Sequence, residues 1–171
     1  MIRQSPICNE ENKMSKSVLI LAAVLGSGLI AGVFFAFSTF VMAALGRLPP
    51  AQSIAAMQSI NTTVINPLFM LVLFGTAVLA GYLGYVSYFS WGNIESKLLL
   101  FGSLSYIAAI VITLTMNVPL NEALAGLDPA GREAQQYWPE FINKWSFYNH
   151  LRAANSTMAC GFFATALRNL I

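Results

Sequence analysis

Long segments without a charged residue constrain this chain more than any other feature. Residues 17–46, 48–94 and 98–121 contain no Asp, Glu, Lys or Arg. A helix needs about 20 mostly apolar residues to cross the hydrocarbon core of a bilayer, and each segment is longer than that. Charged residues make up only 9% of the chain, against about 25% in a typical soluble domain. The sequence therefore predicts an integral membrane protein.

Four membrane-spanning helices are expected, near residues 18–45, 67–90, 98–118 and 143–170. The second should begin at Pro67, because proline is favourable in a helix's first turn and Asn66 can cap it. The third should end before Pro119, because the residue before a proline avoids helical geometry. Residues 51–61 predict a short amphipathic helix at the membrane surface. The expected fold class is all-α: an integral membrane four-helix bundle with a short amphipathic helix between spans 1 and 2. Residues 1–16 would form a disordered polar tail and residues 17–171 one membrane domain.

The expected topology places both termini on the same side of the membrane. Lys and Arg are slightly more numerous on that side, which favours cytoplasmic termini. We therefore expect a protein of the bacterial inner (plasma) membrane whose first partner is the lipid bilayer. The net charge of +2 gives no reason to expect a nucleic acid partner.

Several classes of redox site are disfavoured by what the sequence lacks. There is no Cys-x-x-Cys pair, and the two cysteines, Cys8 and Cys160, lie in a polar tail and an apolar segment. A single histidine argues against a bis-histidine haem, and no acidic residue lies inside an apolar run, as a carboxylate-bridged metal pair would require. We therefore expect neither a metal nor another cofactor.

Polar side chains are concentrated at the end of the bundle opposite the termini, called here the far end. Two asparagines precede the second span and two more close the third span. The fourth span opens with WSFYNHLR. At about 100° per residue, Trp145, Asn149 and Arg152 share one face of that helix, with His150 on its flank. Because unpaired charge in hydrocarbon is costly, this face should point into the bundle. The residues gathered there are Asn61, Asn66, Asn117, Asn121, Trp145, Tyr148, Asn149, His150 and Arg152.

These residues also have purely structural interpretations, which stay open at the sequence level. Asn66 can serve only as a helix cap, and the later asparagines can bind carbonyl groups that Pro119 leaves free. Trp145 can belong to an interfacial aromatic belt. Arg152 can extend toward the head groups, and His150 can be a simple interfacial residue.

Four segments occur in a recognisable order within residues 18–167: AGVFFAFSTFVMAALGRLPPAQSIAAMQSIN, INPLFM, NVPLNEAL and WSFYNHLRAAN. Together they resemble the anthrone oxygenase-like family of small membrane proteins, whose bacterial members have long been labelled a domain of unknown function. The resemblance implies a four-span bundle. It also implies an activity, because the fungal members are thought to oxidise anthrones to anthraquinones with O₂ and without a metal or flavin.

The chemistry implied by this resemblance suits the residue types of the far end. An anthrone loses a proton to give an electron-rich enolate, which reacts with O₂. His150 is the expected base, because histidine is the usual proton acceptor near neutral pH. Arg152 and Asn149 are expected to hold the developing oxyanion. The expected substrate-binding residues are Asn61, Asn66, Asn117, Asn121, Trp145 and Tyr148.

Three functions are consistent with the sequence. The first is a cofactor-independent oxygenase that acts on a lipophilic aromatic compound with O₂. The second is a non-catalytic membrane protein that binds or moves a small lipophilic molecule. The third is an accessory subunit whose polar cluster only fastens the helices together. Turnover of a ligand, rather than binding alone, would separate the first function from the second. Strong destabilisation by substitutions in the cluster, without ligand binding, would identify the third.

Overall fold

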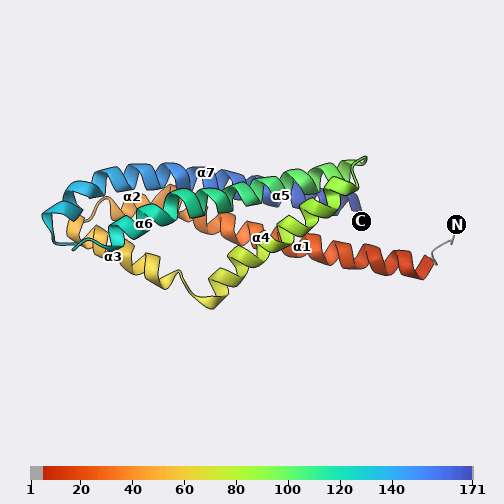
Figure 1. The fold of residues 1–171 in the computed structure, drawn as a ribbon, viewed down its shortest axis with the longest axis horizontal. Helices are drawn as coiled ribbons and strands as arrows, with labels where there is room; N and C mark the ends of the chain where they lie inside the picture. The colour runs from red at the N-terminus through yellow and green to blue at the C-terminus, as the bar shows by residue number, and fades with distance from the viewer. Residues whose placement is uncertain (1–5, 171) are drawn as a thin grey trace.

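The computed structural model describes residues 6–170, with side chains from Lys13 onward. Within this range the chain is all-α and forms no β-strand (Figure 1). Three stretches are long and apolar enough to cross a membrane: Lys13–Leu45, Pro67–Phe89 and Ile94–Ala125. The elements are α1 (Pro6–Ala36), the π-helical turn η1 (Phe37–Val41), α2 (Met42–Leu45), α3 (Pro50–Thr63), α4 (Pro67–Phe89), α5 (Ile94–Ile112), the π-helical turn η2 (Thr113–Asn117), α6 (Val118–Ala125) and α7 (Arg132–Leu170).

The helices form an elongated bundle, and α7 runs along one side of it in Figure 1. Helix α7 packs against both α1 and α5, and α4 packs against α5 and α1. Figure 1 shows α4 crossing the bundle obliquely, with its N-terminal end set away from the other helices. The start of α1 and the end of α7 lie at the same end of the molecule, and α2, α3 and α6 lie at the far end.

Two expected elements are confirmed within a residue or two. The second span was expected at residues 67–90 and is α4, with Asn66 as its N-cap. The Asn66 side chain accepts a hydrogen bond of 3.0 Å from the backbone N–H of Phe69. The amphipathic helix expected at residues 51–61 is α3, which begins at Pro50.

The first helix begins earlier than expected. Residues 1–5 of the expected disordered tail lie outside the described residues, but α1 already starts at Pro6 rather than near residue 18. Proline is favourable in the first helical turn, and the Glu, Lys and Met residues that follow are good helix formers. Lys16 is also held across the bundle, because its Nζ lies 2.5 Å from Oε1 of Glu95 at the start of α5.

The expectation that Pro119 ends the third helix is wrong. The helical stretch continues from Ile94 through η2 and α6 to Ala125. Proline lacks an N–H and crowds the carbonyl four residues earlier, which disturbs a regular α-helix. Here the wider π-helical turn η2 ends at Asn117, two residues before Pro119, and accommodates the disturbance without ending the helix.

The fourth expected span forms only part of a longer helix. Residues 143–170 lie within α7, which begins at Arg132 and carries Pro139 inside it. Helix α7 is not among the three stretches that are apolar enough to cross a membrane. Its polar N-terminal part and the WSFYNHLR segment account for this lower hydropathy.

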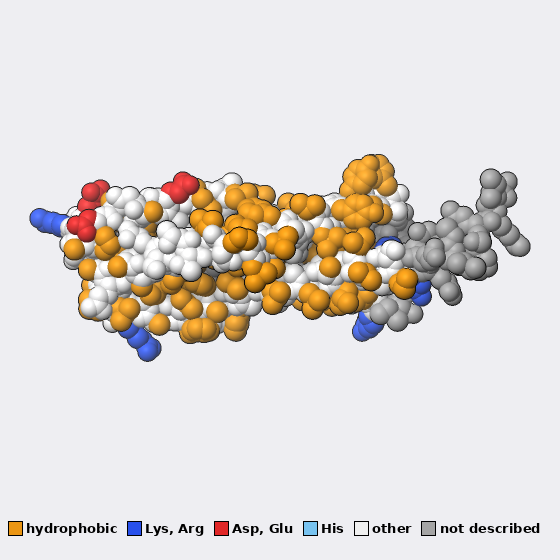
Figure 2. Space-filling view, turned by 90° about the horizontal axis from the view of Figure 1, so that it is seen from below, with side chains coloured by type: hydrophobic (Ala, Val, Ile, Leu, Met, Phe, Trp, Pro, Cys, Tyr) orange, Lys and Arg blue, Asp and Glu red, His pale blue; other side chains and the backbone are white. Residues whose placement is uncertain are grey.

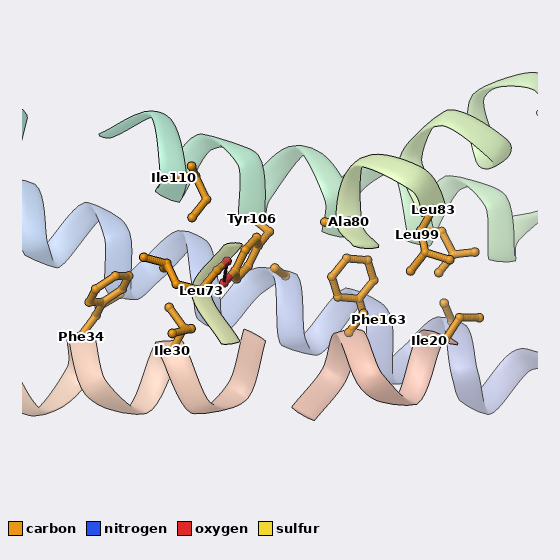
Figure 3. Close-up of a cluster of buried hydrophobic side chains, with 14 residues drawn as sticks. Ile20, Ile30, Phe34, Leu73, Ala80, Leu83, Leu99, Tyr106, Ile110 and Phe163 are labelled. Carbon is orange, nitrogen blue, oxygen red and sulfur yellow. Dashed lines mark hydrogen bonds between the residues drawn. The ribbon is translucent and has the colours of Figure 1, made fainter. Parts of the chain in front are cut away.

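The buried core is divided into two clusters. The larger one lies in the middle of the bundle and joins α1, α4, α5 and α7 (Figure 3). In it the Tyr106 hydroxyl of α5 donates a 3.1 Å hydrogen bond to the backbone carbonyl of Leu73 in α4. The second cluster lies at the far end and joins α2, α3, α6 and α7 around Met57, Phe141 and Trp145.

The surface matches that of a membrane protein. In Figure 2, the charged side chains lie toward the two ends, while hydrophobic side chains cover the length between them. Large exposed apolar residues include Leu29 on α1, Val78 on α4 and Leu104 on α5. In water such a surface would be unfavourable, whereas in a bilayer it faces lipid.

Candidate functional site

A cavity of about 590 Å³ lies between the two core clusters. Its walls come from α1, η1, α3, α4, η2, α6 and α7. Most of the lining is apolar, as is usual for a site that binds a small organic molecule. The aromatic lining residues are Phe34, Phe37, Phe69, Phe74 and Trp145, and the polar ones include Gln58, Asn61, Asn121, Glu122 and Arg152.

Arg152 is the strongest polar group on the cavity wall. Its side chain is only 5% exposed. The guanidinium carbon lies 4.3 Å from the centroid of the Phe34 ring and 5.1 Å from that of Trp145. Among the side chains described, no carboxylate forms an ion pair with it, and its Nε has no hydrogen-bond partner. The guanidinium is thus held between two aromatic rings inside the bundle, and it does not extend to the head groups.

Asn149 fixes the position of Arg152. Its Oδ1 accepts a 2.8 Å hydrogen bond from Nη2 of Arg152. Its Nδ2 donates to the backbone carbonyl of Phe34 and to the hydroxyl of Ser38, each at 2.8 Å. These acceptors lie where α1 passes into η1, and a π-helical turn shifts the backbone hydrogen bonds so that a carbonyl becomes available to a side chain. The fully buried Asn149 therefore ties α7 to the first helix.

Asn117 and Asn121 hold Trp145 in place, the first through its backbone and the second through its indole. Nδ2 of Asn117 donates a 3.2 Å hydrogen bond to the backbone carbonyl of Trp145. Nε1 of Trp145 donates to Oδ1 of Asn121 at 2.8 Å. Trp145 is 4% exposed and packs against Phe37 with ring centroids 5.4 Å apart. Trp145 is therefore a wall of the cavity and does not belong to an interfacial belt.

Helix α3 covers the far end of the cavity. Nε2 of Gln58 donates to the backbone carbonyls of Leu124 and Leu127, each at 2.9 Å, and so fastens α3 to the end of α6. Asn61 lies almost one turn further along α3 and lines the cavity. Its Nδ2 is buried and has no partner among the described residues. This amide is therefore a free donor at the cavity wall.

Three of the expected site residues lie elsewhere. Asn66 is exposed and acts as the cap of α4. His150 is exposed and does not line the cavity, because one residue after Asn149 the helix has turned by about 100°. Tyr148 is half-buried, lies outside the cavity and packs edge-on against Phe147. The geometry therefore gives no support to His150 as the base.

The aromatic residues Phe34, Phe37 and Phe69 were not anticipated as site residues. Each lies in a run of apolar residues, where one phenylalanine cannot be distinguished from its neighbours by residue type. Gln58 and Glu122 were also missing from the expected set, although both are polar residues near the far end. No group of three or more His, Cys, Asp or Glu side chains comes together within the described part of the chain.

Comparison with known proteins identifies the family. No curated protein and no solved structure shows a significant match to this chain. The sequence model of the family described as anthrone oxygenase matches residues 69–162, more than half of the chain. The matched segment contains the lining residues Asn121, Trp145 and Arg152, together with Asn117 and Asn149, which hold Trp145 and Arg152 in place without lining the cavity themselves. The chain therefore belongs to the anthrone oxygenase family.

Proposed function

We propose that the protein crosses the membrane four times, with the C-terminal part of α7 as the fourth span. Helix α7 packs against both α1 and α5, which belong to stretches apolar enough to cross a membrane, and this supports a crossing beside them. Its outward face carries Phe147, Leu151 and Met158, all exposed and apolar. Its polar residues Asn149 and Arg152 face inward, as expected for a membrane helix. With four spans both termini lie on one side, and the positive-charge bias favours the cytoplasm of a bacterial cell.

Within this topology we propose that the cavity binds a flat, lipophilic aromatic compound and oxidises it with O₂. One observation carries this proposal: the guanidinium of Arg152 is buried on the wall of an aromatic cavity, and no described carboxylate forms an ion pair with it. Leaving a charge buried and unpaired is costly, and a ligand oxygen that becomes negative during reaction would relieve that cost. The aromatic walls suit a fused-ring substrate, and an apolar interior dissolves O₂ well.

The reaction can be written for an anthrone-like substrate with a CH₂ group para to a ring carbonyl. Glu122, the carboxylate on the cavity wall, accepts one proton from this CH₂ group. The resulting charge moves onto the carbonyl oxygen, where Arg152 and the free amide of Asn61 donate hydrogen bonds. The enolate carbon adds O₂ and recovers the proton from Glu122 to give a hydroperoxide. Loss of water from that peroxide leaves a second carbonyl, so CH₂ and O₂ become C=O and H₂O.

Turnover by Arg152 variants tests this proposal. The purified protein in lipid nanodiscs is supplied with an anthrone and air, while quinone absorbance and O₂ uptake are recorded. Arg152→Gln should lower kcat by about a hundredfold or more, the usual effect of removing an oxyanion donor. Arg168→Gln is the matched control, because Arg168 is exposed near the end of the same helix. Equal rates for both variants and the original protein would refute the assignment.

One observation favours a second function, the binding or movement of a lipophilic molecule without chemistry. The only histidine of the chain lies outside the cavity, so the group best suited to move protons near neutral pH is not at the site. If the original protein binds the anthrone in the cavity but forms no quinone and consumes no O₂, this second function replaces the first.

A further inference from the structure

The cavity is open on one side. Ile65, Phe74 and Leu114 line it and are also 71%, 42% and 49% exposed. Phe74 belongs to α4, Leu114 to η2, and Ile65 to the link between α3 and α4. These three residues, called here the lateral opening, therefore connect the cavity with the outer surface. In Figure 1 the N-terminal end of α4, which precedes Phe74, stands away from the rest of the bundle.

The lateral opening is apolar and lies on membrane-crossing helices. Phe74 lies on the second turn of α4 and Leu114 within the stretch Ile94–Ala125, both among the three stretches that are apolar enough to cross a membrane. Exposed neighbours on α4 are also apolar, as at Leu71 and Val78. The rim therefore faces hydrocarbon, and an apolar molecule that passes it does not have to leave an apolar environment.

At the far end, α3 covers part of the cavity, although the lining residues Thr62 and Glu122 are exposed there. Helix α3 lies over that end with Ile54 and Met57 fully buried beneath it. The two hydrogen bonds from Gln58 to the backbone of the α6 end hold it in place. The Ser53 hydroxyl adds a 2.6 Å hydrogen bond to the carbonyl of Leu45. These contacts hold α3 over the cavity, and the exposed side chains of Thr62 and Glu122 are polar, so this side is less favourable to an apolar molecule than the lateral opening.

We propose that the lateral opening admits a flat, lipid-soluble aromatic ligand directly from the bilayer to Arg152. The ligand dissolves in the membrane, passes between Phe74 and Leu114, and brings its polar oxygen to the inner wall. The ring system stays in contact with apolar side chains throughout. This inference rests on the proposed function in taking the cavity as the ligand site. It adds the direction of access and restricts the ligand to molecules that partition into lipid.

Fluorescence of Trp145 tests this access without any need for turnover. Trp91→Phe and Trp138→Phe leave Trp145, on the cavity wall, as the single tryptophan of the full chain. The protein is placed in nanodiscs of phosphatidylcholine with brominated acyl chains, which quench tryptophan on contact. Acrylamide in the buffer reports access from water. We expect strong quenching by the brominated chains and weak quenching by acrylamide.

Substitutions at the rim make the test specific. Leu114→Ala widens the lateral opening and should increase quenching by brominated chains, while Leu114→Phe narrows it and should remove most of that quenching. The matched controls are Leu104→Ala and Leu104→Phe, because Leu104 is similarly exposed on α5 at 57% but does not line the cavity. The control substitutions should leave the quenching unchanged.

The opposite pattern would overturn the inference. If acrylamide quenches Trp145 and brominated chains do not, or if changes at Leu114 and Leu104 have equal effects, the ligand does not arrive through the lateral opening. A second copy of the chain covering the opening would also block the brominated chains and so contradict the inference. Quenching as expected without anthrone oxidation would leave the inference standing and refute only the proposed reaction. Anthrone oxidation together with quenching of Trp145 by acrylamide alone would refute the inference and leave the proposed reaction standing.

Discussion

Asn149→Ala is the substitution whose cost can be worked out most fully from the contacts. The side chain is fully buried and makes three hydrogen bonds, to the Phe34 carbonyl, to the Ser38 hydroxyl and to the Arg152 guanidinium. Hydrogen bonds between membrane helices contribute about 0.6 kcal/mol on average and up to about 1.7 kcal/mol. We assign the average to the two neutral bonds and the maximum to the charged one. The expected loss of unfolding free energy is then about 3 kcal/mol.

Asn155→Ala is the matched control for this substitution. Asn155 lies on the same helix, but its side chain only donates to the carbonyl of Leu151, one turn earlier in that helix. Loss of this hydrogen bond should lower the free energy of unfolding by about 0.6 kcal/mol or less, because the bond joins no second helix. The two variants are compared by reversible unfolding in mixed detergent micelles, followed by circular dichroism. Equal destabilisation by Asn149→Ala and Asn155→Ala would show that Asn149 does not tie α7 to α1.

Two further substitutions test other parts of the account. His150→Ala should leave anthrone oxidation and ligand binding nearly unchanged, because this side chain is exposed outside the cavity; a loss of turnover comparable to that of Arg152→Gln would restore His150 as the base. Gly102→Ala should destabilise the bundle by about 1–3 kcal/mol, because the new Cβ would lie 2.8 Å from the ring of Phe163 on α7. Gly32→Ala is its control, since no described residue outside its own helical turn places an atom within 4 Å of the added Cβ; thermal unfolding in detergent compares the two, and equal midpoints would contradict the close α5–α7 packing.

Much of the fold could be predicted because single residues determine element boundaries. Asn66 and Pro67 specify the start of α4 through a side-chain cap and a fixed backbone angle. The inward face of α7 could also be predicted, since Trp145, Asn149 and Arg152 recur at helical spacing and a membrane disfavours exposed polar groups.

The sequence was misleading where neighbouring helices outweigh a local preference. Pro119 favours a helix end, yet α6 packs against α3 and α7 and stays helical, and the π-helical turn accommodates the proline. The sequence also contains Gly28-x-x-x-Gly32, a spacing typical of close helix packing; a Cβ at Gly28 would lie 3.4 Å from Sγ of Cys160, but one at Gly32 would meet no described atom within 4 Å. In this part of the helix the close approach is at Gly26, where an added Cβ would collide with Thr76 of α4.

The candidate site was only partly predictable for a related reason. Helical phase places a residue to within about one position, and one position is a turn of about 100°. That difference separates the buried Asn149 from the exposed His150. The aromatic walls depend on which of many apolar residues face inward, which is decided by tertiary packing and not by residue type.

The most direct test of the central claim is the distance between Arg152 and a bound ligand in lipid. Solid-state NMR on the protein with ¹⁵N-labelled arginine, loaded with an anthrone carrying ¹³C at its carbonyl, measures dipolar coupling between the two labels. The account predicts a close guanidinium–carbonyl contact in the original protein that disappears in Arg152→Lys and persists in Arg168→Lys. A bound anthrone whose carbonyl shows no coupling to any arginine would contradict it.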